Sequence, residues 1–183
     1  PGSEEFDLFI KEIRREMTSK CGQKCTAIRR IIVPADRVED VQIALGKSLS
    51  KTVIGDPQAE GVRMGALVSK SQQEEVQRRI AELQESSQIV FGNMDEIEVL
   101  GADKDKGAFI SPIVLLNDNP RQNLASHTVE AFGPVSTIMP YQNMDEAIEI
   151  ANMGKGSLVS TICTYDQKIA TEYVMNAAAF HGR

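Results

Sequence analysis

Residues 20–34 read KCGQKCTAIRRIIVP, and this stretch carries the change from helix to strand on which the predicted fold depends. Before it, apolar side chains recur at helical spacing and predict an amphipathic helix over residues 4–20. Gly22 follows as a helix-ending residue. The β-branched run AIRRIIV (27–33) is typical of a strand. Cys25 is therefore expected where the helix gives way to the strand.

The same alternation of helix and strand continues along the chain. Further helices are predicted around residues 38–49, 71–83, 144–151 and 169–177, and further strands at 88–92, 108–116, 135–141 and 157–165. Asp36 is expected to cap the first of these helices, and Ser69 or Ser71 the second. Pro112 suits a sheet edge or a bulge. This order predicts one α/β unit with three layers, in which helices cover a largely parallel sheet.

Composition excludes several classes of function. The chain has 183 residues, a hydrophobic fraction of 42% and a net charge of −6, which argues against nucleic acid or an anionic membrane as the partner. No apolar run approaches the roughly 20 residues that span a bilayer. The three cysteines cannot all pair within one chain. Free thiols and a cytoplasmic location are therefore expected.

Cys25 has several interpretations when it is considered alone. A free cysteine is most often buried and inert, and a non-catalytic scaffold domain would leave it so. A zinc site with Cys21 would need two more ligands, but the other candidates are scattered, so no metal site is predicted. Paired with His127, Cys25 could serve a thiol hydrolase or acyltransferase. Arg29 and Arg30 are near enough in sequence to favour a thiolate, although a strand sends them to opposite faces.

A second cluster of interest is VEAFGPV, residues 129–135. It places the carboxylate of Glu130 and the ring of Phe132 just before a Gly-Pro turn and a predicted strand. Loops at strand ends often carry binding groups. Taken alone, however, the pattern favours a turn in which Phe132 fills the core.

Four segments, in this order, resemble the aldehyde dehydrogenase superfamily: GQKCTAIRR (22–30), GDPQAEGVRMGALVS (55–69), GAFISPIVL (107–115) and EAFGPV (130–135). The first is similar to the nucleophile segment of that family, and the last to its cofactor-side Glu-x-Phe-Gly-Pro motif. The resemblance covers almost the whole chain. It is strongest to the dehydrogenase part of the bifunctional ring-opening enzymes of bacterial phenylacetate degradation, where this part is fused to an enoyl-CoA-hydratase-like domain.

The resemblance implies a role for three side chains. Cys25 matches the nucleophile that attacks the aldehyde carbon, forms a thiohemiacetal and, after hydride transfer, carries a thioester that water cleaves. Its backbone N–H matches one half of the oxyanion hole. Glu130 matches the residue that holds the nicotinamide ribose, and Phe132 the ring beside the nicotinamide. Gly22 and Gln23 would shape the turn that presents Cys25.

The resemblance also implies groups that these residues do not supply. NADP or NAD would be bound mainly by an upstream domain, which would also contribute a general-base Glu and the oxyanion-hole Asn. We therefore expect residues 1–183 to be the catalytic domain of a longer, homo-oligomeric protein. The implied substrate is an aldehyde, specifically a CoA-linked semialdehyde. The isolated segment is expected to fold but not to oxidise aldehydes unaided.

Overall fold

The computed structural model describes residues 2–94 and 96–183. At its centre lies a four-stranded sheet in the order β1-β4-β3-β2. The strands are β1 (Arg30–Pro34), β2 (Gln88–Phe91), β3 (Ile113–Leu116) and β4 (Val135–Tyr141). The pairs β1–β4 and β3–β4 are parallel, and β2 pairs with β3 in the antiparallel sense. The predicted α/β class with a largely parallel sheet is thus confirmed.

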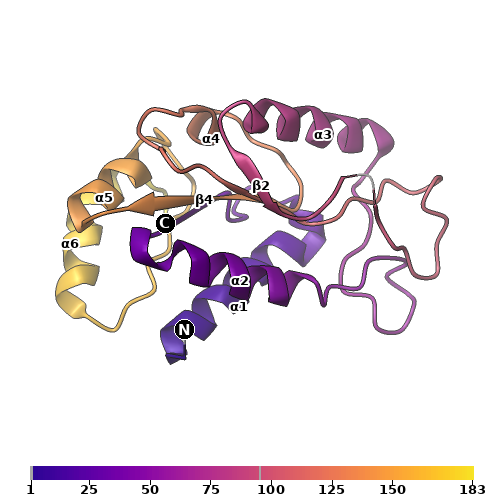
Figure 1. Ribbon diagram of the computed structural model, residues 1–183, viewed down its shortest axis with the longest axis horizontal. Coiled ribbons are helices and arrows are strands. Elements are labelled where there is room, and N and C mark those ends of the chain that lie inside the picture. Colours follow the sequence, from indigo (N-terminus) through magenta and orange to yellow (C-terminus); the bar gives the residue numbers. More distant parts are fainter. Residues whose placement is uncertain (1, 95) are drawn as a thin grey trace.

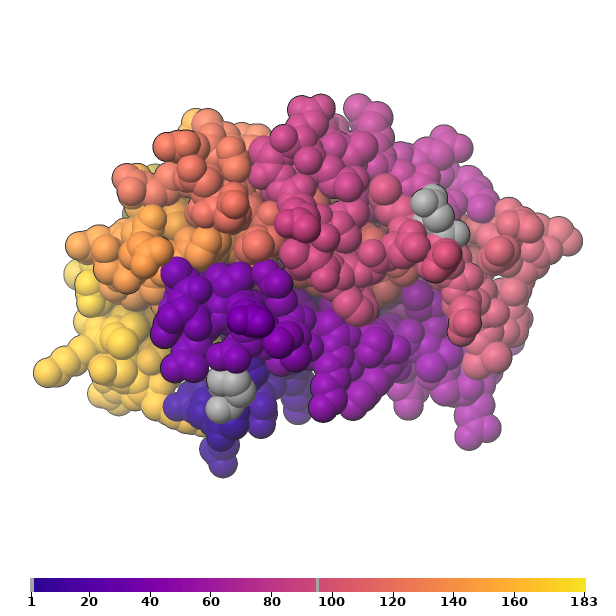
Figure 2. Space-filling model, in the orientation of Figure 1, coloured from indigo at the N-terminus to yellow at the C-terminus, as the bar shows by residue number. Residues whose placement is uncertain are grey.

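Helices cover both faces of this sheet (Figure 1). They are α1 (Glu4–Thr18), α2 (Val38–Leu49), α3 (Lys70–Gln84), the short α4 (Ala125–Thr128), α5 (Met144–Asn152) and α6 (Gln167–Ala177). Helices α1 and α2 lie on one face, and α3 and α4 on the other. Helices α5 and α6 form one end of the molecule, and the loops at 50–69 and 96–112 form the opposite end (Figures 1 and 2).

The alternation of side chains along β3 divides the core in two. Ile113 and Leu115 are buried in an apolar cluster with α3, whereas Val114 is buried in a second cluster with α1 and α2. Successive residues of a strand point to opposite faces, so one short apolar strand serves both layers. A strand with two covered faces explains why residues 113–115 are all apolar.

The passage from α1 to β1 is a tight left-handed turn. Helix α1 ends at Thr18, two residues before its predicted end. Lys20 and Cys21 then have φ values of 53° and 54°, and Gly22 has φ 66°. A Cβ atom at Gly22 would lie 2.2 Å from the carbonyl oxygen of Gly133. Only glycine combines this backbone conformation with so close an approach of a second chain segment.

Two expected details near the element ends are wrong. Asp36 does not cap α2: it lies in a 3₁₀ turn over Ala35–Arg37, and Arg37 occupies the cap position, where its side chain makes no capping hydrogen bond. Pro112 precedes the interior strand β3 instead of lying at an edge, and the bulge lies in β2, between Ile89 and Phe91. A proline lacks the N–H that a ladder needs, so β3 begins only after it. Ser69, by contrast, caps α3 as predicted.

The prediction of a strand at 157–165 is also wrong: among the residues that the structure describes, this segment is extended but forms no strand. Only its beginning is paired, with the last residues of the chain: Gly182 N–H donates to Ser157 O at 3.0 Å, and Ser160 N–H to Arg183 O at 2.9 Å. A groove separates the segment from β1. A β-branched sequence becomes a strand only where a neighbouring strand meets its backbone groups, and here that neighbour is missing across the groove.

Arg30 on β1 ties α5 to the sheet. Its guanidinium donates to Ile150 O at 2.9 Å, to Ala151 O at 3.0 Å and to Ser157 Oγ at 3.0 Å. The two carbonyls belong to the last turn of α5, where a cation also interacts favourably with the helix dipole. Arg30 is therefore a structural residue.

His127 is held by the same network. Its Nε2 lies 2.8 Å from Pro120 O, and its Nδ1 lies 3.2 Å from Nη1 of Arg30. A carbonyl only accepts and a guanidinium only donates, so His127 is the neutral Nε2–H tautomer. Burial lowers the pKa of His127, the bond to Pro120 opposes this shift, and the charge of Arg30 adds to it.

We expect Gly22→Ala to lower the free energy of unfolding by about 2–5 kcal/mol, through backbone strain and the clash with Gly133. Gly61→Ala is the matched control, because Gly61 has φ 89° and nothing within 4 Å of an added Cβ atom. This control should lose only the strain, about 1 kcal/mol. Urea denaturation measures both, and equal losses would contradict the account.

We expect the free energy of unfolding to fall as the pH is lowered from about 7.5 to about 5.5. The folded state holds the pKa of His127 below its ordinary value of 6.5, so the unfolded chain binds more protons in this range. Stability is thus present above pH 6.5 and is lost as the pH falls through the lowered pKa. His127→Gln should give a shallower slope of stability against pH. An unchanged slope would show that His127 does not contribute.

Candidate active site

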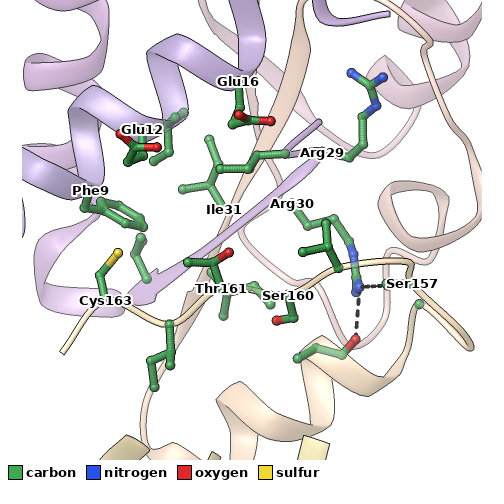
Figure 3. A pocket seen from close by; sticks show the side chains of 18 of the residues that line it. Phe9, Glu12, Glu16, Arg29, Arg30, Ile31, Ser157, Ser160, Thr161 and Cys163 are labelled. Atoms are coloured by element: carbon green, nitrogen blue, oxygen red, sulfur yellow. Dashed lines mark hydrogen bonds between the residues drawn. The ribbon is translucent and has the colours of Figure 1, made fainter. Parts of the chain in front are cut away.

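A groove of about 1070 Å³ opens along β1. Figure 3 shows Phe9, Glu12 and Glu16 of α1 on one side of this strand. Ser160 and Thr161 of the extended segment lie on the other side, and Cys163 of the same segment also lines the groove. The groove is also lined by all three residues that the sequence singled out, Cys25, Glu130 and Phe132. The structure thus brings together side chains that are more than a hundred positions apart in the sequence.

The parallel pairing of β1 and β4 explains this convergence. The segment that carries Cys25 (residues 22–29, the Cys25 turn) leads into β1, and the segment that carries Glu130 and Phe132 (residues 129–134, the Glu130 loop) leads into β4. Arg30 of β1 is paired with Thr137 of β4. Since parallel neighbours begin at the same edge of a sheet, the two segments lie next to each other.

The Cys25 turn is held by backbone and side-chain hydrogen bonds. Lys24 N–H donates to Gly22 O at 2.9 Å, and Ala27 N–H donates to Lys24 O at 3.1 Å. The Gln23 Oε1 atom accepts from Val68 N–H at 2.9 Å, which fixes the turn to the segment before α3. Within residues 2–94 and 96–183, the Cys25 N–H has no hydrogen-bond acceptor. This N–H is therefore free to bind a developing oxyanion.

The three thiols differ in accessibility. Cys25 is exposed, whereas Cys21 is buried and Cys163 is intermediate. Burial raises the pKa of Cys21 to about 12, so this thiol stays protonated at neutral pH. Burial and the nearby charge of Glu12 raise the pKa of Cys163. Because the thiolate is the nucleophilic form, exposure favours Cys25 over the other two.

Arg29 joins the Cys25 turn to the Glu130 loop, and it is the residue whose role sequence reasoning missed. Its Nη2 donates to Gly22 O at 2.7 Å and its Nη1 to Gly133 O at 2.6 Å. Its Nε lies 3.3 Å from Oε1 of Glu130, and its Cζ lies 5.4 Å from the ring centroid of Phe132. Burial lowers the pKa of Arg29, and the charge and hydrogen bond of Glu130 oppose the shift.

Arg29 and Arg30 leave the chain in different directions, as strand geometry predicts (Figure 3). Arg30 extends toward Ser157 and α5, and Arg29 extends toward the two loops. This alternation could have revealed the role of Arg29 from the sequence. Two successive arginines that point to opposite sides of a buried segment both need hydrogen-bond acceptors.

The arrangement of His127 weighs against a cysteine–histidine pair. Its two ring nitrogens already bind Pro120 O and Arg30, so neither is free to accept a proton from the Cys25 thiol. In the part of the chain that the structure describes, no group of three or more His, Cys, Asp or Glu side chains could hold a metal ion. Among the same residues, no helix is long and apolar enough to cross a membrane.

Comparison with known proteins finds similarity to aldehyde dehydrogenases. The model of the aldehyde dehydrogenase family matches residues 3–181. The 3,4-dehydroadipyl-CoA semialdehyde dehydrogenase of Aromatoleum evansii is 43% identical over 183 residues, which are 100% of this chain and 36% of that protein. The chain thus spans about a third of the length of this relative.

Solved structures share the fold. Aldehyde dehydrogenase C of Pseudomonas syringae, a cysteine-to-alanine mutant in complex with NAD+ and octanal, matches with a TM-score of 0.83 and 25% identity, over 99% of this chain and 36% of that chain. Betaine aldehyde dehydrogenase of Staphylococcus aureus, in complex with NAD+, matches with a TM-score of 0.84 and 22% identity, over 94% of this chain and 33% of that chain. Because the model of the aldehyde dehydrogenase family matches residues 3–181, nearly the whole chain, this chain belongs to the aldehyde dehydrogenase family.

Proposed function

We propose that this chain is the cysteine-bearing catalytic domain of an NAD(P)-dependent aldehyde dehydrogenase, with Cys25 as the nucleophile. One observation carries the proposal: Cys25, Glu130 and Phe132 line the same groove, and Arg29 binds the two segments that hold them. Membership of the family supports it. The remaining parts of such a site, including a general base, are proposed to lie outside these 183 residues.

The chemistry would begin with the exposed thiol of Cys25. Its thiolate attacks the aldehyde carbon, a C–S bond forms, and the carbonyl π electrons move to the oxygen. The free N–H of Cys25 donates to that oxyanion. The oxygen lone pair then re-forms the C=O bond as a hydride leaves the same carbon, which turns the thiohemiacetal into a thioester. Water adds to the thioester, the C–S bond breaks, and the acid, a proton and the thiolate are released.

The residues of the Glu130 loop fit one end of a nicotinamide cofactor, which accepts the hydride when bound. The Glu130 side chain is 57% exposed, so its carboxylate can accept hydrogen bonds from ribose hydroxyls. The partly buried ring of Phe132 offers an apolar face beside it. NAD and NADP share the nicotinamide end, so these residues suit either cofactor.

The substrate class rests on one relative. The protein of Aromatoleum evansii, identical at 43% of positions over the whole chain, is named for a CoA-linked semialdehyde. We infer that this chain also serves the oxidation of a CoA-linked semialdehyde, within a longer, homo-oligomeric, cytoplasmic protein. We infer one further partner, which is a fused hydratase-like domain as in the phenylacetate ring-opening enzymes.

We expect Cys25→Ala to lower NAD(P)-dependent oxidation of a CoA-linked semialdehyde by more than about 10³-fold, because the covalent intermediate cannot form. The assay uses the full-length protein and follows NAD(P)H absorbance, with octanal and betaine aldehyde as comparison substrates. Cys21→Ala is the matched control, since that thiol is buried four positions away.

The control should keep its activity once the folded fraction is taken into account. Activity retained by Cys25→Ala would contradict the proposed nucleophile and favour a scaffold role for this domain. Hydrolysis of a thioester without any need for cofactor would favour the hydrolase alternative.

A further inference from the structure

Arg29 is a mostly buried cation directly before β1, and it has no part in the chemistry described above. Its side chain is only 19% exposed. Its backbone is fixed to the sheet, because the Thr137 N–H of β4 donates to Arg29 O at 2.8 Å. A buried guanidinium needs acceptors for its donors. The acceptors that Arg29 finds belong to the two segments of the candidate site.

The guanidinium first joins two backbones. It donates to Gly22 O at 2.7 Å and to Gly133 O at 2.6 Å. These two glycines also touch, since a Cβ atom at Gly22 would lie 2.2 Å from Gly133 O. A third, long contact of 3.5 Å reaches Lys24 O, in the peptide unit whose N–H belongs to Cys25. The Cys25 turn is thus fixed against the Glu130 loop at both glycines.

The same guanidinium also orients the side chains of the Glu130 loop. Its Nε lies 3.3 Å from Oε1 of Glu130, which leaves the other carboxylate oxygen for a ligand. Its Cζ lies 5.4 Å from the centre of the Phe132 ring, within the range of a cation–π contact. Arg29 therefore contacts both residues that are proposed to bind the nicotinamide end of the cofactor.

We propose that Arg29 is a positioning residue that sets the distance between the Cys25 thiol and the cofactor-binding face of the Glu130 loop. This inference rests on the proposed function and deepens it. Hydride transfer requires the carbon bound to Cys25 to lie in contact with the nicotinamide, and a misplacement of about 1 Å costs on the order of 10²-fold in rate. Arg29 acts on this distance through the two segments, not by touching the reacting atoms.

Lysine cannot replace this residue. Arginine presents five N–H donors in a rigid planar fork, whereas lysine has one ammonium on a flexible stem. Arg29 uses separate nitrogens for Gly22, Gly133 and Glu130. The N–H donors of an ammonium all share one nitrogen, which cannot take the three separate positions of the Arg29 nitrogens. Substitution by lysine, although it keeps the positive charge, should therefore still release the contact between the loops.

The test compares Arg29→Lys and Arg29→Met with Arg30→Lys in the full-length protein. Arg30 is a matched control, because it is adjacent and donates to two backbone carbonyls, but on the side of α5. We expect both Arg29 variants to lower kcat/KM on the order of 10²-fold, with a higher KM for NAD(P)+. Arg30→Lys should lower stability but keep kcat/KM per folded molecule.

Two outcomes would overturn the proposal. One is an Arg29→Met variant as active as the wild type, and the other is an Arg30→Lys variant that loses as much activity as Arg29→Lys. Circular dichroism gives the folded fraction to which each rate refers. Should Arg29→Met fail to fold, Arg29→Lys, which keeps the charge, still decides between these outcomes.

A double-mutant cycle with Glu130→Gln tests the route through Glu130. If Arg29 raises cofactor affinity by orienting this carboxylate, Arg29→Met should not raise the KM for NAD(P)+ further once Glu130→Gln is present. Independent, additive effects of the two substitutions on this KM would contradict that route.

The rate of Cys25 alkylation by iodoacetamide, without cofactor, separates this proposal from the proposed function. A wild-type protein that oxidises no aldehyde would remove the proposed function. Even then, Arg29→Met should change the rate of Cys25 alkylation, because the turn is released, and Arg30→Lys should not. An unchanged rate in Arg29→Met would refute the positioning role whatever the activity.

Discussion

The candidate site depends on the hydrogen bonds that the mostly buried guanidinium of Arg29 donates. Removal of a charge from water is costly unless its donors are matched, and Arg29 matches them with the carbonyls of Gly22 and Gly133 and the carboxylate of Glu130. The parallel pairing of β1 and β4 supplies the frame, since both segments lead into neighbouring strands at one edge. Glycine at position 22 then allows the two backbones to approach.

This arrangement separates the chemical roles of residues that are close in sequence. Cys21 and Cys25 are four positions apart, yet the left-handed turn buries the first thiol and exposes the second. Arg29 and Arg30 are adjacent, yet one binds the candidate site and the other the end of α5. Local backbone geometry thus decides which thiol can react and which cation can serve the site.

Much of the fold could be predicted because its signals are local. The β-branched run at 135–141 and the serine before α3 mark their elements through propensity and capping alone. The strand expected at 157–165 failed because pairing depends on a distant neighbour. The role of Arg29 was missed for the same reason: Glu130 lies 101 positions away, and Gly133 lies 104 positions away. For the site, the motifs indicated Cys25, Glu130 and Phe132, but only three-dimensional packing joins them.

Under the proposed function, the Cys25 thiol carries the substrate beside a cofactor held at the Glu130 loop. The decisive experiment is mass spectrometry of the full-length protein, acid-quenched during turnover of a CoA-linked semialdehyde. We expect an acyl group on the peptide that contains Cys25, formed only when NAD(P)+ is present, because the thioester arises by loss of hydride. An acyl group on Cys163 instead, or equal labelling of Cys25 without cofactor, would contradict the proposed function.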